Sequence, residues 1–157
     1  MKTFLTIVLV IIFILALVYI IFDHKSFTFT ADIDGSTFDG NRAKVIYTSG
    51  RLKISAFHAA ADSPLVVIDL NATKTGTYLL NDDNSATGNV AVYFAKKNVF
   101  ASNSRFTGSV TITKFDLEEK EVSGTFAFQG VQVVPPGLKV VNVTNGEFEN
   151  LPIGNRK

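Results

Sequence analysis

The sequence predicts an all-β protein, an antiparallel sandwich or flattened barrel of about 8–10 strands, preceded by one N-terminal transmembrane helix. Three observations predict this fold: an uncharged N-terminal run, repeated alternation of apolar and polar residues beyond position 22, and turn residues between the alternating runs. Beyond that position, the apolar period of a helix never persists for more than two turns. We therefore divide the chain into an N-terminal anchor, residues 1–22, and one exported all-β domain, residues 23–157.

The first expected element is the uncharged run at residues 3–22, TFLTIVLVIIFILALVYIIF. About 20 residues at roughly 1.5 Å each match the thickness of a bilayer's hydrocarbon core. The run ends in bulky side chains and not in the small residues of a signal-peptidase site. We expect an uncleaved single-pass anchor, with a cleaved signal peptide as the alternative. Because Lys2 precedes the run, we expect a cytoplasmic N-terminus and a periplasmic or extracellular C-terminal domain.

Strands are expected wherever apolar and polar residues alternate between turn residues. Phe27 and Phe29 alternate with polar neighbours, and Asp34-Gly35 then turns the chain back into Thr37-Phe38. Residues 65–68 are apolar at successive positions, which is typical of a central strand. Further strands are expected at residues 43–48, 51–57, 65–70, 77–80, 89–95, 106–113, 121–128 and 138–144, the last continuing through Asn145-Gly146 into 147–151.

Residues 108–128, GSVTITKFDLEEKEVSGTFAF, predict a β-hairpin with one apolar side. Val110 and Ile112 share one face of the first strand. The return strand places Val122, Phe126 and Phe128 on a single face, with a glycine among them that suits a bulge or a close approach of another strand. The charged residues fall at the connection, where they are solvated. We therefore interpret this stretch as scaffold and not as a site.

Several stretches carry a resemblance that covers nearly all of residues 27–150: FTADIDG at 29–35, GTY at 76–78, VTITKFD at 110–116, VSGTF at 122–126 and VTNGEF at 143–148. Together they resemble a functionally uncharacterised family of small exported β domains that is common in Bacteroidota. Such proteins are mostly lipoproteins, tethered through a cysteine. This chain has no cysteine, so the resemblance implies that the uncleaved helix replaces the lipid. It implies fold and location only, because the family brings no catalytic residue or cofactor.

Composition narrows the possible functions. The absence of cysteine excludes disulfides, thiolate nucleophiles and thiolate metal sites. Fourteen acidic and 14 of the 15 basic residues follow position 22, so the exported part has no net formal charge. We therefore expect no nucleic-acid partner. The expected partners are the membrane, through residues 3–22, and an unknown envelope protein, glycan or lipid.

The strongest candidate ligands for a metal are Asp32, Asp34 and Asp39, in the stretch DIDGSTFDG. An EF-hand requires a glycine at position six of its loop and a bidentate glutamate at position twelve, and neither is in register here. A hairpin turn at Asp34-Gly35 is the favoured explanation of the cluster. We keep the three aspartates only as weak calcium candidates and expect no cofactor.

Catalytic motifs are not evident. The two histidines, His24 and His58, are not associated with a recognisable nucleophile motif. We expect a membrane-anchored, outward-facing β-sandwich that acts as a non-catalytic binding or structural module of the cell envelope. The alternative is a small β-barrel that carries a lipophilic ligand, which the bulky residues on the inward faces disfavour. An envelope hydrolase is the least favoured hypothesis.

Overall fold

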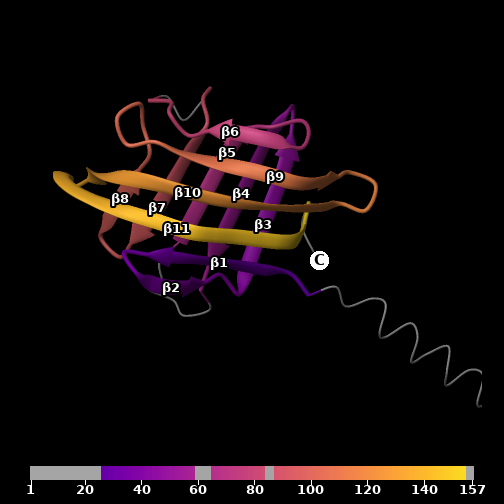
Figure 1. Ribbon diagram of the computed structural model, residues 1–157, viewed down its shortest axis with the longest axis horizontal. Coiled ribbons are helices and arrows are strands. Elements are labelled where there is room, and N and C mark those ends of the chain that lie inside the picture. Colours follow the sequence, from indigo (N-terminus) through magenta and orange to yellow (C-terminus); the bar gives the residue numbers. More distant parts are fainter. Residues whose placement is uncertain (1–25, 59–64, 84–86, 155–157) are drawn as a thin grey trace, which may run out of the picture.

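The computed structural model describes residues 26–58, 65–83 and 87–154, which form one antiparallel sheet of eleven strands (Figure 1). These ranges contain no helix, and hence none that could cross a membrane. The expected anchor, residues 3–22, lies outside them. The strands are β1 (Thr28–Ile33), β2 (Ser36–Asp39), β3 (Arg42–Thr48), β4 (Arg51–Phe57), β5 (Leu65–Asn71), β6 (Gly76–Leu79), β7 (Val90–Ala95), β8 (Asn98–Ala101), β9 (Gly108–Asp116), β10 (Glu121–Val134) and β11 (Pro136–Pro152).

Strand β10 joins the two layers of the sheet. One of its edges pairs with β9 in the first half and with β8 in the second, while β11 follows its other edge. The front layer has the order β6-β9-β10-β11-β1-β2, and the back layer continues from β8 through β7, β5 and β4 to β3. Figure 1 shows the strands of the two layers crossing steeply.

The sheet curls until its far edge returns to the front layer. A bridge between Val45 of β3 and Gly154, just beyond β11, makes this contact. Three register shifts between β10 and β11, which mark bulges or irregularities, accompany the bending of these long strands. The result is a half-barrel: one sheet folded over itself, with its apolar side chains between the layers.

The core is filled by alternating residues of both layers. Phe29, Phe126 and Phe148 form its aromatic centre, with ring centroids 5.1–6.2 Å apart. Ile54 and Ile68 of the back layer are also fully buried. All buried apolar residues of the described part lie between positions 29 and 151. The described residues thus form a hydrophobic core of their own, as expected of a domain that folds as a unit.

The structure confirms the all-β prediction and refines its architecture. The sequence predicted a sandwich or a flattened barrel of about 8–10 strands, and the described part has eleven strands in one curled sheet, a half-barrel. The expected central strand is β5, between β4 and β7, although its burial alternates. β8 was missed because four residues, Asn98–Ala101, are too few to show alternation.

The hairpin at residues 108–128 is also confirmed. Val110, Ile112 and Val122 are buried on one face, together with Phe126 and Phe128. Its glycine, Gly124, lies at a register shift. A Cβ atom there would collide with the Thr111 carbonyl and approach the Phe148 ring to 2.8 Å. Both expectations for this glycine, a bulge and a close approach, therefore hold.

Replacement of Phe126 by alanine should lower the free energy of unfolding by about 3–5 kcal/mol, because it empties the aromatic centre of the core. Glu119→Ala is the control: this carboxylate is 3.3 Å from the Lys114 ammonium, but both side chains are exposed. It should cost less than about 0.5 kcal/mol. Denaturant unfolding of residues 23–157 measures both values. Similar small losses would show that the hairpin contributes little to the core.

Candidate functional site

A cleft of about 700 Å³ lies between the β1–β2 hairpin, the β7–β8 hairpin and the first half of β11. It lies where the two layers diverge, beside the corner formed by β10 and β8. Its lining residues are Ile33, Asp34, Ser36, Thr37, Phe38, Asp39, His58, Tyr93, Ala95, Asn98, Phe100, Lys139 and Val141. Volumes of this order accommodate small-molecule ligands.

The floor of the cleft is apolar and largely aromatic. Phe38, Tyr93 and Phe100 are each more than 90% buried, and Ile33 and Val141 complete the surface between them. The Tyr93 and Phe100 rings stack, with centroids 6.0 Å apart and planes inclined by 27°. They come from paired positions on β7 and β8, so the short β8 strand sets their stacking. This floor offers a rigid apolar surface to a ligand.

The β1–β2 turn fixes one side of the rim. Asp34 and Gly35 both have positive φ angles, 48° and 80°, as the tight turn requires. The Asp34 carboxylate accepts a hydrogen bond from the Asn142 N–H group at 2.8 Å. The Asp34 N–H group in turn donates to the Asn142 carbonyl at 2.9 Å. The turn is therefore fastened to β11, which holds a carboxylate at the mouth of the cleft.

Electrostatics at the rim involve Asp34 and Tyr93. The pKa of the Tyr93 hydroxyl is raised, first by burial and then by the negative charge of Asp34. The phenol is therefore neutral at physiological pH and can donate a hydrogen bond. Asp39 and Lys139 add one charge of each sign to the lining. The cleft thus combines an apolar floor with donors and acceptors at its edge.

The three calcium candidates do not converge. Asp32 accepts hydrogen bonds from the Thr37 hydroxyl at 3.4 Å and from the Asn145 amide at 2.8 Å, on the outer face of the front layer. Asp34 and Asp39 line the cleft. Within the described ranges, no group of three or more acidic or histidine side chains could hold a metal ion. His58 also lines the cleft, and its backbone carbonyl accepts a 3.4 Å bond from Arg42.

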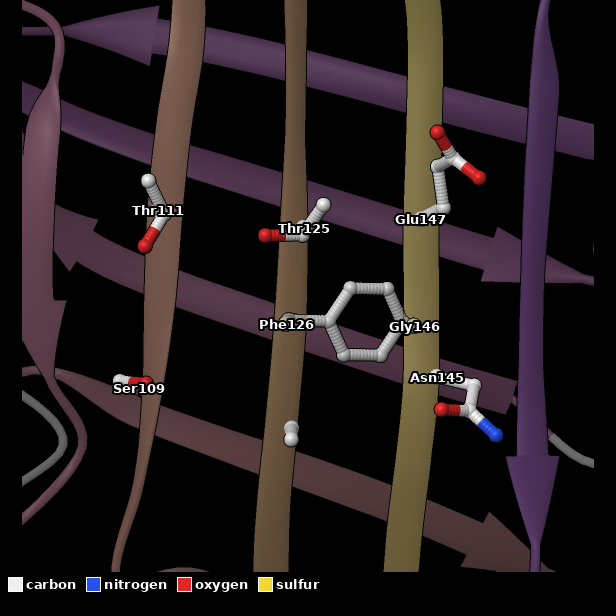
Figure 2. Close-up of a pocket in the computed structure, with 8 residues that line it drawn as sticks. Ser109, Thr111, Thr125, Phe126, Asn145, Gly146 and Glu147 are labelled. Atoms are coloured by element: carbon white, nitrogen blue, oxygen red, sulfur yellow. The ribbon is translucent and has the colours of Figure 1, made fainter.

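A second hollow, of about 400 Å³, crosses the outer face of β9, β10 and β11 (Figure 2). Thr111, Thr125 and Glu147 form a row across the three strands, as their pairing requires. Gly146 lines the hollow, and its lack of a side chain makes room on the inner face for the Phe126 ring, which a Cβ would approach to 2.6 Å. The hollow is a trough in a hydroxyl-rich sheet face. With only a small apolar floor, it is the weaker candidate.

Sequence reasoning identified Asp34 and Asp39 but missed the aromatic floor. Tyr93 belongs to an expected strand, and its place beside the Lys96-Lys97 turn was the only signal that it lies near an end of the sheet. Phe100 flanks the same turn, but its stacking on Tyr93 was not evident, because the strand that contains it was not predicted. Lys139 and Val141 belong to the long hairpin of β10 and β11, whose pairing with the back layer was not evident from the sequence.

An NMR titration of ring-labelled tyrosine, assigned with Tyr93→Phe, should place the Tyr93 midpoint above the ordinary value of about 10. Asp34→Asn should lower it but leave it raised, since burial is the larger cause. The tyrosine ionises first in the unfolded chain, so folding stability should fall as pH rises from about 10 through the folded pKa. A Tyr93 midpoint at the ordinary value would contradict the buried setting of the floor.

Comparison with known proteins identifies a family but no activity. A family model described as "Domain of unknown function (DUF6252)" matches residues 25–152, which include all but the last two described residues and nearly all of the sheet. No curated protein and no solved structure matches the chain. The match covers most of the chain and the whole core, and the chain therefore belongs to the DUF6252 family of domains of unknown function.

Proposed function

We propose that this protein is a non-catalytic binding domain of the cell envelope, tethered to a membrane by residues 3–22, and that the end cleft is its binding site. The observation that carries the proposal is the cleft itself: about 700 Å³ with an aromatic floor and a polar rim. Concave sites of this composition are the usual places where proteins bind small molecules.

Binding is favoured over catalysis by the hydrogen bonds around the cleft. The Thr37 hydroxyl is directed to Asp32 on the outer face. The bond recorded for His58 uses its carbonyl and not its imidazole. Asp34 is held by a backbone N–H group. Nucleophilic catalysis commonly pairs a hydroxyl with a histidine base, and among the described residues none of these bonds joins a hydroxyl to the His58 imidazole.

The ligand class follows from the two zones of the cleft. Phe38, Tyr93 and Phe100 would cover an apolar body, while Asp34 and Asn98 would meet a polar end. The filled core between the layers disfavours the enclosed cavity of a barrel carrier, since its side chains are packed at near-zero exposure. We therefore propose a small amphipathic ligand in an open cleft, in place of a lipophilic cargo sealed inside a barrel.

Folded residues 23–157 should bind the neutral fluorescent probe N-phenyl-1-naphthylamine saturably, at one molecule per chain. Ala95→Phe should abolish this binding by filling the cleft. Ala127→Phe is the matched control: it adds the same ring to the outer trough and should leave binding unchanged. Fluorescence titration measures both. Loss of binding in the control alone would assign the probe to the trough. If the unmodified domain does not bind the probe saturably, the proposal is overturned.

The full-length protein should stay with the membrane fraction after carbonate washing and should retain its first 22 residues. The reason is the uncharged 20-residue run, whose length matches a bilayer. Cell fractionation with N-terminal mass spectrometry tests this. A soluble protein that begins near Asp23 would show that the run is a cleaved signal peptide.

A further inference from the structure

The turn between β10 and β11 is the most apolar exposed feature of the described part. Residues 133–140, which we name the β10–β11 tip, are all exposed. Leu138 is 97% exposed and Val134 is 52% exposed, and the tip also contains two prolines. Val133 and Val140 add further exposed apolar surface. Soluble surfaces rarely expose large aliphatic side chains together without a function.

Basic residues slightly outnumber acidic residues beside the tip. Lys139 belongs to it, and the adjacent β7–β8 turn contributes Lys96 and Lys97. That turn is adjacent because Val134 pairs with Val99 of β8, one residue beyond Asn98. Leu138, Arg105 and Asp83 line a neighbouring hollow. The Asp83 carboxylate accepts hydrogen bonds from the N–H group and the hydroxyl of Ser104. Asp34 and Asp39 line the adjoining cleft together with Lys139. With them included, four basic residues stand beside three acidic ones, and the tip is an apolar loop with a small excess of positive charge beside it.

We propose that the β10–β11 tip docks on an anionic lipid surface. The aliphatic side chains and prolines would enter the interfacial region of the bilayer, and the lysines would contact lipid phosphates. Lysine suits this place, since its ammonium group can stay at the headgroups while its stem covers apolar surface. This surface does not depend on whether the cleft is occupied.

The length of the chain allows this docking on the membrane that holds the tether. Thr28 is six positions beyond Phe22, so β1 must begin within about 20 Å of the end of the tether. Thr28 pairs with Glu149, which is thirteen residues along β11 from Pro136, on the order of 40 Å at the strand rise. The start of β1 and the tip thus lie at opposite ends of the domain (Figure 1). Two attachments so placed would lay the domain along the bilayer.

The β9–β10 turn is a natural control within the same chain. Leu117 is 51% exposed there, but its neighbours are Asp116, Glu118 and Glu119. An anionic surface repels such a turn, although it too exposes a leucine. Comparing variants of the two turns therefore distinguishes membrane binding that needs only an exposed apolar side chain from binding that also needs positive charge.

The first test is co-sedimentation of folded residues 23–157 with vesicles of phosphatidylcholine, with or without phosphatidylglycerol. The domain should sediment with the anionic vesicles only, and raising the salt concentration should weaken binding. Leu138→Ser should reduce the affinity by about tenfold. Leu117→Ser, the same change on the acidic turn, should leave it unchanged.

The second test concerns charge. Lys96→Gln with Lys97→Gln should weaken binding to anionic vesicles by at least about tenfold, because each lysine near such a surface contributes to attraction. Lys44→Gln with Lys53→Gln makes the same charge change on exposed positions of β3 and β4 and should have little effect. Circular dichroism of all four variants checks the fold.

Three results would overturn the proposal. One is equal sedimentation with neutral and anionic vesicles. Another is equal loss of binding in the tip and control variants. The third is an absence of vesicle binding together with self-association that Leu138→Ser abolishes. Sedimentation velocity measures the self-association. This result would assign the tip to contact with a second copy of the chain.

Discussion

The architecture depends on the divided pairing of β10. Its first half pairs with β9 and its second half with β8, while β11 follows the whole strand. A strand that belongs to both layers converts two sheets into one, and the shifts of register let it bend. β8 meets it at only three positions, from Val131 to Val134. The cleft lies between strands of the two layers that this corner connects, the β1–β2 hairpin and β11 on one side and the β7–β8 hairpin on the other.

Close packing explains why this opening lies at an end and not in the middle. Under the front layer, Phe29, Phe126 and Phe148 are so tightly arranged that two strand positions accept only glycine. A Cβ at Gly124 would reach the Phe148 ring, and one at Gly146 would reach the Phe126 ring. Aromatic rings that cover strand glycines replace the missing side chains. No interior space is left for a ligand in this region, and binding must use the margin of the core.

The sequence predicted the elements better than their assembly. Strands with clear alternation, such as β4 at Arg51–Phe57, were placed correctly to the residue, because the pattern and the turn residues around it are local. The division of β10 between two partners was not predictable, since it depends on pairing across more than thirty positions, such as Gln132 with Phe100. The residues of the candidate site show the same difference between local and long-range features. Asp34 was found through its own turn, whereas the stacking of Tyr93 on Phe100 required the missed strand.

The net charge of the sequence does not reveal how the charged side chains are distributed over the surface. Residues 23–157 have no net charge, which argued against any polyanionic partner. In the structure, however, acidic side chains gather at the β9–β10 turn, and lysines gather around the β10–β11 tip. Screening in salt limits such charges to a range of about 10 Å, so a surface responds to the local cluster and not to the total. A domain without net charge can therefore present a locally basic surface to an anionic membrane, even though an acidic turn lies at the far end of the same sheet.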